Sequence, residues 1–377
     1  MGEIKKWIWQ HERYPRFTYD HMQVAPALFQ VSKNVGVLEG TIRHLDKNDV
    51  TSVKVEAALN EIISTSEIEG EILRRDSVRS SVRKRLDETF DPAEDRSSRQ
   101  TDTLTDILID SSYNHAPLTV ERLHAWHHAL FSSGYSGMNR VTPGRFRDHD
   151  DMSVVSGPIG KEKVHYIALP ASRIDKDIDA LLEYCNHSKD DPFVKSALAH
   201  LWFVTIHPYD DGNGRIARAL TNNVLSRELG LDHKYYSISA AVNQERKGYY
   251  EVLEKSQNLI YNRAFDLTPW ILWHTHMIDR AIDISLEHIE VVISKTKFWD
   301  RVRSESLNEK QLKVIHKMLD KGEHGFEGGL TNKKYRAMTK VSTATAARHI
   351  KELVAKGVIH EVKGHGGRST RYEISFS

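Results

Sequence analysis

The chain has 377 residues, of which 53 are Lys or Arg and 52 are Asp or Glu, so its formal net charge is +1. This balance excludes a chain that is basic or acidic throughout, and 39% hydrophobic with 28% charged residues is typical of folded rather than disordered proteins. A lone cysteine, Cys185, excludes an internal disulfide, and with no apolar run of ~20 residues and no signal-peptide core we expect a cytoplasmic protein.

Helical periodicity covers most of the chain before residue 295. Apolar residues recur at helical spacing in 20–63, and Thr119 followed by Val120-Glu121 is typical of a capped helix start. The segment 87–100 is rich in charged residues and serine and contains Pro92, so we expect a loop or linker there. Further helices are predicted at 174–184, 193–205, 215–229, 249–259 and 269–293. The expected fold class is therefore mainly α.

One β-hairpin signal interrupts this helical part. The β-prone runs 153–155 and 164–167 flank Gly157-Pro158-Ile159-Gly160, which is typical of two strands joined by a turn. It is the only clear hairpin signal before the C-terminal region. An ordinary surface hairpin without a binding role is the alternative.

Positive charge is concentrated at the C-terminal end. Residues 307–377 contain 14 Lys or Arg against 7 Asp or Glu, so this module carries +7 and the remainder −6. Its pattern predicts three helices and then strands at 358–362 and 370–374 around a basic, glycine-rich loop, which resembles a winged helix. Docking of a protein is the alternative to DNA binding. The side chains expected in a DNA major groove are Thr343, Thr345, Arg348 and Lys351, with Lys363 and Arg368 near phosphates.

The segment from His207 to Arg218 has the backbone chemistry of an anion site. Pro208 disfavours helix at the residue before it, and the residue types in Gly212–Gly214 tolerate positive φ. The amides of such a loop, together with those of a helix that we expect to start near Gly214, can form a nest for anionic oxygens.

Four side chains add to this nest. Arg215 and Arg218 lie three residues apart on one face of the predicted helix and offer two guanidinium forks to phosphates. Asp211 supplies a hard oxygen ligand for Mg²⁺, and His207 is the one group here that exchanges protons near neutral pH. A glycine turn with surface arginines is the alternative, but a turn requires neither the histidine nor the arginine pair. The full set predicts a phosphoryl- or nucleotidyl-transfer site.

The segment resembles the signature of the Fic family, His-(Phe)-(Asp/Glu)-Gly-Asn-Gly-Arg followed by a second Arg, with Tyr209 in place of the usual Phe. The resemblance implies a helical core in which the 151–167 hairpin is the flap that pairs with an extended target segment. It also implies transfer of AMP from ATP to a Ser, Thr or Tyr hydroxyl of a protein, including the enzyme itself, with release of pyrophosphate.

Individual roles follow from the same resemblance. His207 would be the general base, Asp211 would hold Mg²⁺, and Arg215 and Arg218 would bind the β- and γ-phosphates. Tyr250 would lie near the nucleoside, with core packing as the alternative for it and for Tyr249. The residues implied to bind nucleotide are Gly212, Asn213, Gly214, Arg215, Ile216, Ala217, Arg218, Tyr250 and, as an inhibitor, Glu69.

A second motif, Thr65-Ser66-Glu67-Ile68-Glu69-Gly70, resembles the inhibitory helix of the family, Ser/Thr-x-x-x-Glu-Gly/Asn. By that resemblance, Glu69 would pair with Arg218 and block the γ-phosphate position, and Gly70 would end the helix. The pattern is short and occurs by chance often. The inhibitory residues implied here are Thr65, Glu69 and Gly70.

These expectations combine into an N-terminal helical domain (1–104), a Fic core (105–295) and a winged helix (305–377). The predicted function is an autoinhibited protein adenylyltransferase that uses ATP and Mg²⁺, with a target protein on the flap, DNA or protein on the winged helix, and a homodimer as a further option. A nucleotide-sensing DNA-binding regulator and a Fic enzyme transferring another phosphate-containing group are the alternatives. His207 favours an enzyme, because a sensor has no use for a base. Surface or capping roles are expected for His124, His127, His128, His274 and His276.

Overall fold

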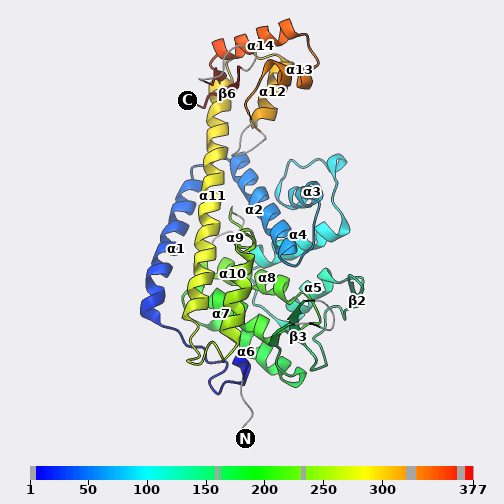
Figure 1. Cartoon of the computed structure of the whole chain (residues 1–377), viewed down its shortest axis with the longest axis vertical. Coiled ribbons are helices and arrows are strands. Elements are labelled where there is room, and N and C mark those ends of the chain that lie inside the picture. Colours follow the sequence, from blue (N-terminus) through cyan, green and yellow to red (C-terminus); the bar gives the residue numbers. More distant parts are fainter. Residues whose placement is uncertain are drawn as a thin grey trace. The chain divides into compact units, whose positions relative to one another are not determined.

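The computed structural model describes residues 6–157, 161, 163–230, 235–319, 328–362 and 370–376. Helices dominate these residues, which confirms the predicted mainly α class (Figure 1). The chain divides into two units, Met1–Ser285 and Leu286–Ser377.

Two 22-residue helices form the expected N-terminal helical stretch, α1 (His21–Ile42) and α2 (Lys47–Ile68). Each begins after an aspartate, Asp20 or Asp46, whose carboxylate accepts hydrogen bonds from amides of the first turn. Apolar side chains along α2, such as Leu59 and Ile62, pack in a cluster with residues of the next two helices.

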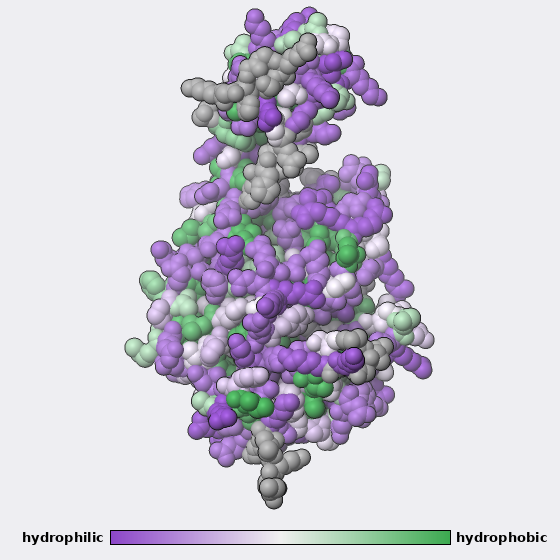
Figure 2. Space-filling view, in the orientation of Figure 1, coloured by the Kyte–Doolittle hydropathy of each residue, from purple (hydrophilic) through white to green (hydrophobic). Residues whose placement is uncertain are grey.

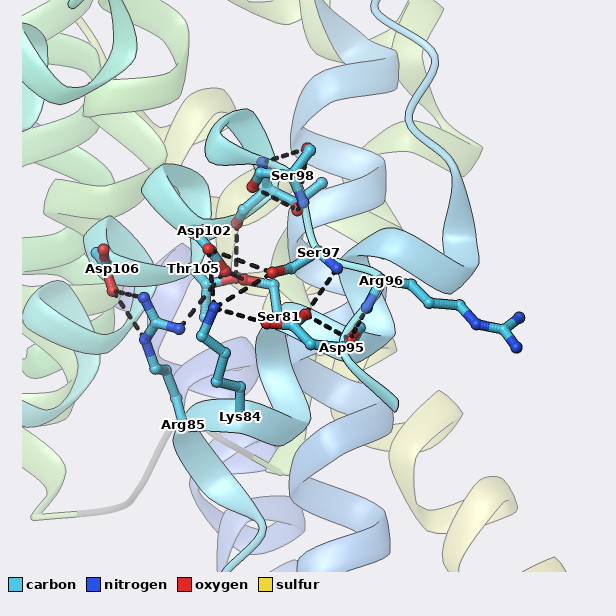
Figure 3. A network of polar contacts seen from close by, with 12 residues as sticks. Ser81, Lys84, Arg85, Asp95, Arg96, Ser97, Ser98, Asp102, Thr105 and Asp106 are labelled. Atoms are coloured by element: carbon cyan, nitrogen blue, oxygen red, sulfur yellow. Dashed lines mark hydrogen bonds and ion pairs between the residues drawn. The ribbon is translucent and has the colours of Figure 1, made fainter. Parts of the chain in front are cut away.

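Those next helices are α3 (Arg75–Leu86) and α4 (Arg99–Tyr113). The loop predicted between helical blocks is residues 87–98, and a polar network ties it to both helices (Figure 3). Lys84 Nζ donates to Asp95 Oδ2 and to Asp102 Oδ2, each at 3.0 Å, and Arg85 Nη2 donates to Asp106 Oδ1 at 2.8 Å. The loop is thus fastened in place instead of linking separate domains, and the expected boundary at residues 104/105 falls inside α4.

The helices that carry the site pack around α7, in which every side chain from Phe193 to Ile206 is buried. A mostly apolar helix that is buried on all sides belongs in a core, and α7 packs most extensively against α8. Ile206 and Ile216 lie in the resulting hydrophobic cluster. The helices of this part are α5 (Val120–Leu130), α6 (Ile174–His187), α7 (Pro192–Ile206), α8 (Asn213–Leu229), α9 (Ile238–Gln244), α10 (Arg246–Gln257) and α11 (Thr268–Val302).

Two β-hairpins accompany these helices. The predicted hairpin is confirmed as β3 (Ser153–Ser156) paired antiparallel with β4 (Lys163–Ile167); residues 158–160 and 162 of its turn lie outside the described residues. Tyr166 anchors β4, because its buried hydroxyl donates to the Thr205 carbonyl of α7 at 2.7 Å. The sequence did not predict the other, β1 (Tyr135–Ser136) paired with β2 (Asn139–Arg140).

A buried carboxylate joins α2 to its neighbours. Glu61 accepts hydrogen bonds from Ser237 Oγ at 2.7 Å and from the Ser239 backbone N–H at 3.0 Å; Ser237 caps α9 and Ser239 lies in its first turn. The Ser239 hydroxyl and Asn222 Nδ2 of α8 also donate to it. Since a buried charge is costly unless it is hydrogen-bonded, this network fixes the position of α2.

The C-terminal unit has the predicted order of three helices and two strands. Its third helix begins after Ser342, whose hydroxyl accepts from the Thr345 N–H at 3.1 Å. Lys363 and Arg368 of the expected basic loop lie outside the described residues. The elements are α12 (Glu309–Leu319), α13 (Asn332–Thr339), α14 (Thr343–Ala355), β5 (Ile359–Glu361) and β6 (Tyr372–Ile374).

The surface shown in Figure 2 is mostly hydrophilic, with hydrophobic residues in separate small patches. Among the helices described here, none combines the length and the apolar character that crossing a bilayer requires.

Candidate functional site

The loop between α7 and α8 has a special backbone at two points. His207, directly after α7, has φ 51° and ψ 59°, a left-handed conformation that is uncommon outside glycine, and Gly212 has φ 77°. The helix α8 begins at Asn213, one residue before the expected start, so Asn213 and Gly214 are helical and only Gly212 of the three uses positive φ. The first-turn amides of α8 have no acceptor within the helix and remain available to a ligand.

Asn213 closes this loop. Its side chain accepts from the Tyr209 N–H at 3.0 Å and donates to the Tyr209 carbonyl at 2.8 Å. Both polar atoms of the side chain are therefore used within the loop, which leaves its backbone N–H as the group that can contact an anion.

The ring of Tyr209 is buried against two histidines. It stacks on His127 at 4.0 Å between centroids with planes 6° apart, and its hydroxyl lies 3.0 Å from His124 Nδ1. The expectation of a surface or capping role was wrong for His127, which is fully buried and accepts from the Gly144 N–H at 2.9 Å. His274 is buried as well. Sequence spacing gave no sign of this, because the contacts of His127 join α5 to loop residues that are distant in the sequence.

The structure holds the His207 imidazole in its neutral form. Its Nδ1 lies 3.2 Å from the Val204 carbonyl, which accepts the Nδ1 proton and leaves Nε2 as a free acceptor. Burial lowers the pKa of His207 to about 4; the Arg147 guanidinium also lowers it, and the Val204 carbonyl, Asp211 and Glu69 oppose the shift. Arg147 is buried and donates from Nε to the His207 carbonyl at 2.9 Å.

Two hydrogen bonds, one to each oxygen, fix the orientation of the Asp211 carboxylate. Oδ2 accepts from Ser136 Oγ of the β1–β2 hairpin at 2.5 Å, and Oδ1 accepts from the Gly212 N–H at 2.5 Å. Within the described ranges no three His, Cys, Asp or Glu side chains are grouped to hold a metal ion. Mg²⁺ usually takes only one or two carboxylates and completes its shell with phosphate oxygens and waters, so a single aspartate beside an anion cradle suits a phosphate-bound Mg²⁺.

The first turn of α8 forms a cradle that leaves no room for a side chain at Gly214. A Cβ there would lie 2.5 Å from Glu69 Oε1 and 3.3 Å from Arg218 Nη1. Arg215 Nε and Arg218 Nη1 are buried without a hydrogen-bond partner among the described residues. Unpaired buried guanidinium donors beside free helix amides suit an anionic ligand.

Two residues implied to bind nucleotide face the core. The side chains of Ile216 and Ala217 are fully buried in the hydrophobic cluster, and the Ile216 N–H bonds the Gly212 carbonyl at 3.1 Å. Their side chains are therefore not available to a ligand.

Arg218 is held by the end of α2. Its Nη2 donates to Glu69 Oε1 at 2.7 Å and to the Thr65 carbonyl at 3.1 Å, and its Nε donates to Thr65 Oγ1 at 2.7 Å. The geometry places Glu69 on the arginine that the resemblance implies. Gly70 lies just past the helix at φ 83°, as expected of a terminating glycine.

Arg215 is held by a carboxylate that the sequence did not point to. Its Nη1 donates to Glu71 Oε1 at 2.9 Å, and its guanidinium lies 5.1 Å from the Phe131 ring centroid. Glu71 lies outside the recognised motif, so only the fold reveals this contact.

The two tyrosines of α10 differ in exposure. Tyr249 is buried, with its hydroxyl 3.0 Å from His200 Nε2, whereas Tyr250 is 43% exposed and donates to the Ile68 carbonyl of α2 at 3.3 Å. Tyr250 is therefore the one placed to meet a ligand.

Parts of the chain are similar to known protein families and to curated proteins. A family model described as the Fic/DOC family matches residues 117–225, and one described as a domain of unknown function (DUF4172) matches residues 7–87. Protein adenylyltransferase Fic of Nematostella vectensis is 35% identical over 95 residues, which cover 25% of this chain and 19% of that protein. The protein of the same name in Culex quinquefasciatus is 28% identical over 120 residues, or 32% of this chain and 21% of that one. The chain thus spans about a fifth of the length of these curated relatives.

Solved structures share the fold. A Fic family protein from Desulfovibrio desulfuricans G20 superposes with a TM-score of 0.54 at 17% identity, covering 96% of this chain and 98% of that one. A signalling protein with a Fic domain from Bacteroides thetaiotaomicron VPI-5482 gives a TM-score of 0.50 at 16% identity, with 69% and 97% covered. Together with the signature loop between α7 and α8, the family model shows a Fic/DOC domain at residues 117–225, and the solved structures share its fold.

Proposed function

We propose that this chain is a protein adenylyltransferase that moves AMP from ATP to a Ser, Thr or Tyr hydroxyl of a protein and releases pyrophosphate. The observation that carries the proposal is a neutral His207 with a free Nε2 beside the anion cradle of α8. The names of the curated relatives support AMP as the transferred group.

The proposed in-line displacement needs a general base, groups that bind the leaving phosphates and a metal ligand, and the site offers a residue for each. Nε2 of His207 takes the proton of the target hydroxyl as its oxygen attacks the α-phosphorus, and the bond from that phosphorus to the pyrophosphate oxygen breaks. The first-turn amides of α8, with Arg215 and Arg218, bind the β- and γ-phosphates and stabilise the charge of the leaving group. Asp211 would hold Mg²⁺, which supplies charge neutralisation when it is bound.

The β3–β4 hairpin is the proposed target-binding element. Val155, Val164 and Ile167 of its strands are between 38% and 49% exposed, although they are apolar. An extended target segment added to a strand edge would hydrogen-bond to the backbone and cover such side chains.

Inhibition by Glu69 is part of the proposal. Its 2.7 Å contact with Arg218 Nη2 uses a donor that the γ-phosphate needs, so ATP has to displace the carboxylate. Substitution of Glu69 should therefore raise transfer.

The test incubates wild type, Glu69→Gly, His207→Ala and the double variant with Mg²⁺ and each nucleoside triphosphate, followed by intact-mass measurement. We expect an AMP-sized increase on Glu69→Gly with ATP, and none on the variants that lack His207. Unchanged or lower labelling of Glu69→Gly would remove the inhibitory role. A mass other than that of AMP would support transfer of a different phosphate-containing group.

A DNA contact through α14 is a second proposal. Thr343, Arg348 and Lys351 of this helix are exposed, while Ala346, Ile350 and Leu353 on its other side lie in the hydrophobic core of the C-terminal unit. Duplex binding by the full chain that weakens with salt and with Arg348→Ala/Lys351→Ala would support it, whereas binding that is indifferent to both would favour a protein partner.

A further inference from the structure

We infer that Glu71 is a second inhibitory carboxylate, which holds Arg215 while Glu69 holds Arg218. The inference rests on the proposed function, because it takes the two arginines as ligands of the β- and γ-phosphates. It adds a residue outside the inhibitory motif. It also means that each carboxylate competes with a different phosphate of the nucleotide for its arginine.

One turn of backbone brings both carboxylates to α8. After the last residue of α2, the Gly70 N–H bonds the Glu67 carbonyl and the Glu71 N–H bonds the Ser66 carbonyl, each at 2.9 Å. These two bonds, with Gly70 at φ 83°, define a helix-terminating turn that reverses the chain. Glu69 and Glu71 therefore lie on either side of Gly70 and reach arginines that are three residues apart on one face of α8.

The two contacts differ in strength. Arg218 donates three hydrogen bonds, two to Thr65 and one to Glu69, and its side chain is 5% exposed. Arg215 has a single carboxylate partner at 2.9 Å, its side chain is 8% exposed, and Glu71 is 35% exposed. Water screens the more exposed pair, so Glu71 should be the weaker of the two inhibitory groups.

Arg215 is otherwise prepared for a ligand. Its guanidinium is positioned over Phe131 by packing, so it does not need Glu71 to stay in place. Nε is buried without a partner among the described residues, and Nη1 is the donor that Glu71 occupies. A phosphate that binds the Arg215 guanidinium can accept a hydrogen bond from Nε directly, but it has to displace Glu71 from Nη1.

The assignment predicts a distinct pattern across nucleotides. Neutralising Glu69 frees the γ-phosphate arginine and should tighten ATP but not ADP. Neutralising Glu71 frees the β-phosphate arginine and should tighten both ADP and ATP but not AMP. A general change of surface charge would instead tighten all three, since all are anions.

The experiment is isothermal titration calorimetry of the full chain with AMP, ADP and ATP in the presence of Mg²⁺, without any target protein. The variants are Glu71→Gln, Glu69→Gln and their combination. Glu88→Gln is the matched control, because it removes an equal charge from an exposed pair with Lys47. We expect Glu71→Gln to bind ADP and ATP about three- to tenfold more tightly, with unchanged AMP affinity, and the combined variant to bind ATP more tightly than either single one.

The result that overturns the inference is an unchanged ADP affinity in Glu71→Gln, or an equal gain for AMP. Thermal melting of each variant checks that it is folded. The proposed function fails separately: if the nucleotide pattern is found but no AMP is transferred, Glu71 still controls Arg215. If Glu69→Gly transfers AMP while Glu71→Gln binds ADP like wild type, the proposed function is supported and the inhibitory role of Glu71 is refuted.

Discussion

His207, the proposed general base, should remain active at unusually low pH. With a pKa of about 4, His207 is about 99% neutral at pH 6, whereas a histidine of ordinary pKa 6.5 would be about 24% neutral. We therefore expect the rate of AMP transfer by Glu69→Gly to be flat between pH 8 and pH 6. It should decline only as the pH approaches 4.

The use of the Glu69→Gly variant does not change the direction of this prediction. Burial is the main cause of the low pKa, and Glu69 is one of the groups that oppose it. Removing Glu69 therefore lowers the pKa of His207 further and extends the flat region.

The assay is the single-turnover rate of AMP transfer at saturating ATP and constant ionic strength, from pH 5.5 to pH 8.5. Circular dichroism at each pH checks that the protein is folded. An inflection between pH 6 and pH 7, with a roughly fourfold loss of rate at pH 6, would refute the argument that burial keeps this histidine neutral.

Three further predictions concern stability and the proposed metal ligand, Asp211. Gly212→Ala should cost about 2–4 kcal/mol in urea unfolding, because Gly212 has φ 77° and the new Cβ would lie 2.7 Å from Phe131 Cε2. Gly40→Ala is the control that should not destabilise: no atom lies within 4 Å of its Cβ, and alanine inside α1 should add about 0.5–1 kcal/mol. Ser136→Ala should raise the Mg²⁺ concentration needed for ATP binding a few-fold, because Asp211 Oδ2 loses its 2.5 Å hydrogen bond, and Ser136→Thr should not. Burial lowers the pKa of His127 to about 4 and of His274 to about 3, so the unfolded chain takes up protons first as the pH falls from about 6.5 toward 4. The urea midpoint should thus be lower at pH 5 than at pH 7.5, and equal midpoints would contradict the neutral buried histidines.

Much of the fold was predictable because its signals are local. The Thr119 side chain caps α5 by accepting from the Arg122 N–H, as its position before an acidic first turn indicates. The β3–β4 hairpin follows from two β-prone runs and a glycine turn. In the signature loop, residue identity alone indicated the cradle and its arginines.

The rest depends on contacts between distant segments. Ser136 lies in a hairpin of two-residue strands, too short to show periodicity, yet it bonds Asp211 across 75 residues of sequence. Glu71 and Arg215 are 144 residues apart, and their pairing depends on the turn at Gly70. The spacing of His127 relative to other polar residues gave no hint that it is buried under Tyr209.

The buried Glu61 network limits how α2 can move if Glu69 and Glu71 inhibit the enzyme as proposed. Pulling α2 away as a rigid rod would strip this carboxylate of its donors, Ser237, Ser239 and Asn222, at a cost of several kcal/mol. Fraying only the segment after Glu61 leaves that network intact and still frees Glu69 and Glu71, which follow Glu61 by about two to three helical turns. On the proposed inhibition, relief thus needs local unfolding of a short stretch of helix rather than displacement of all of α2.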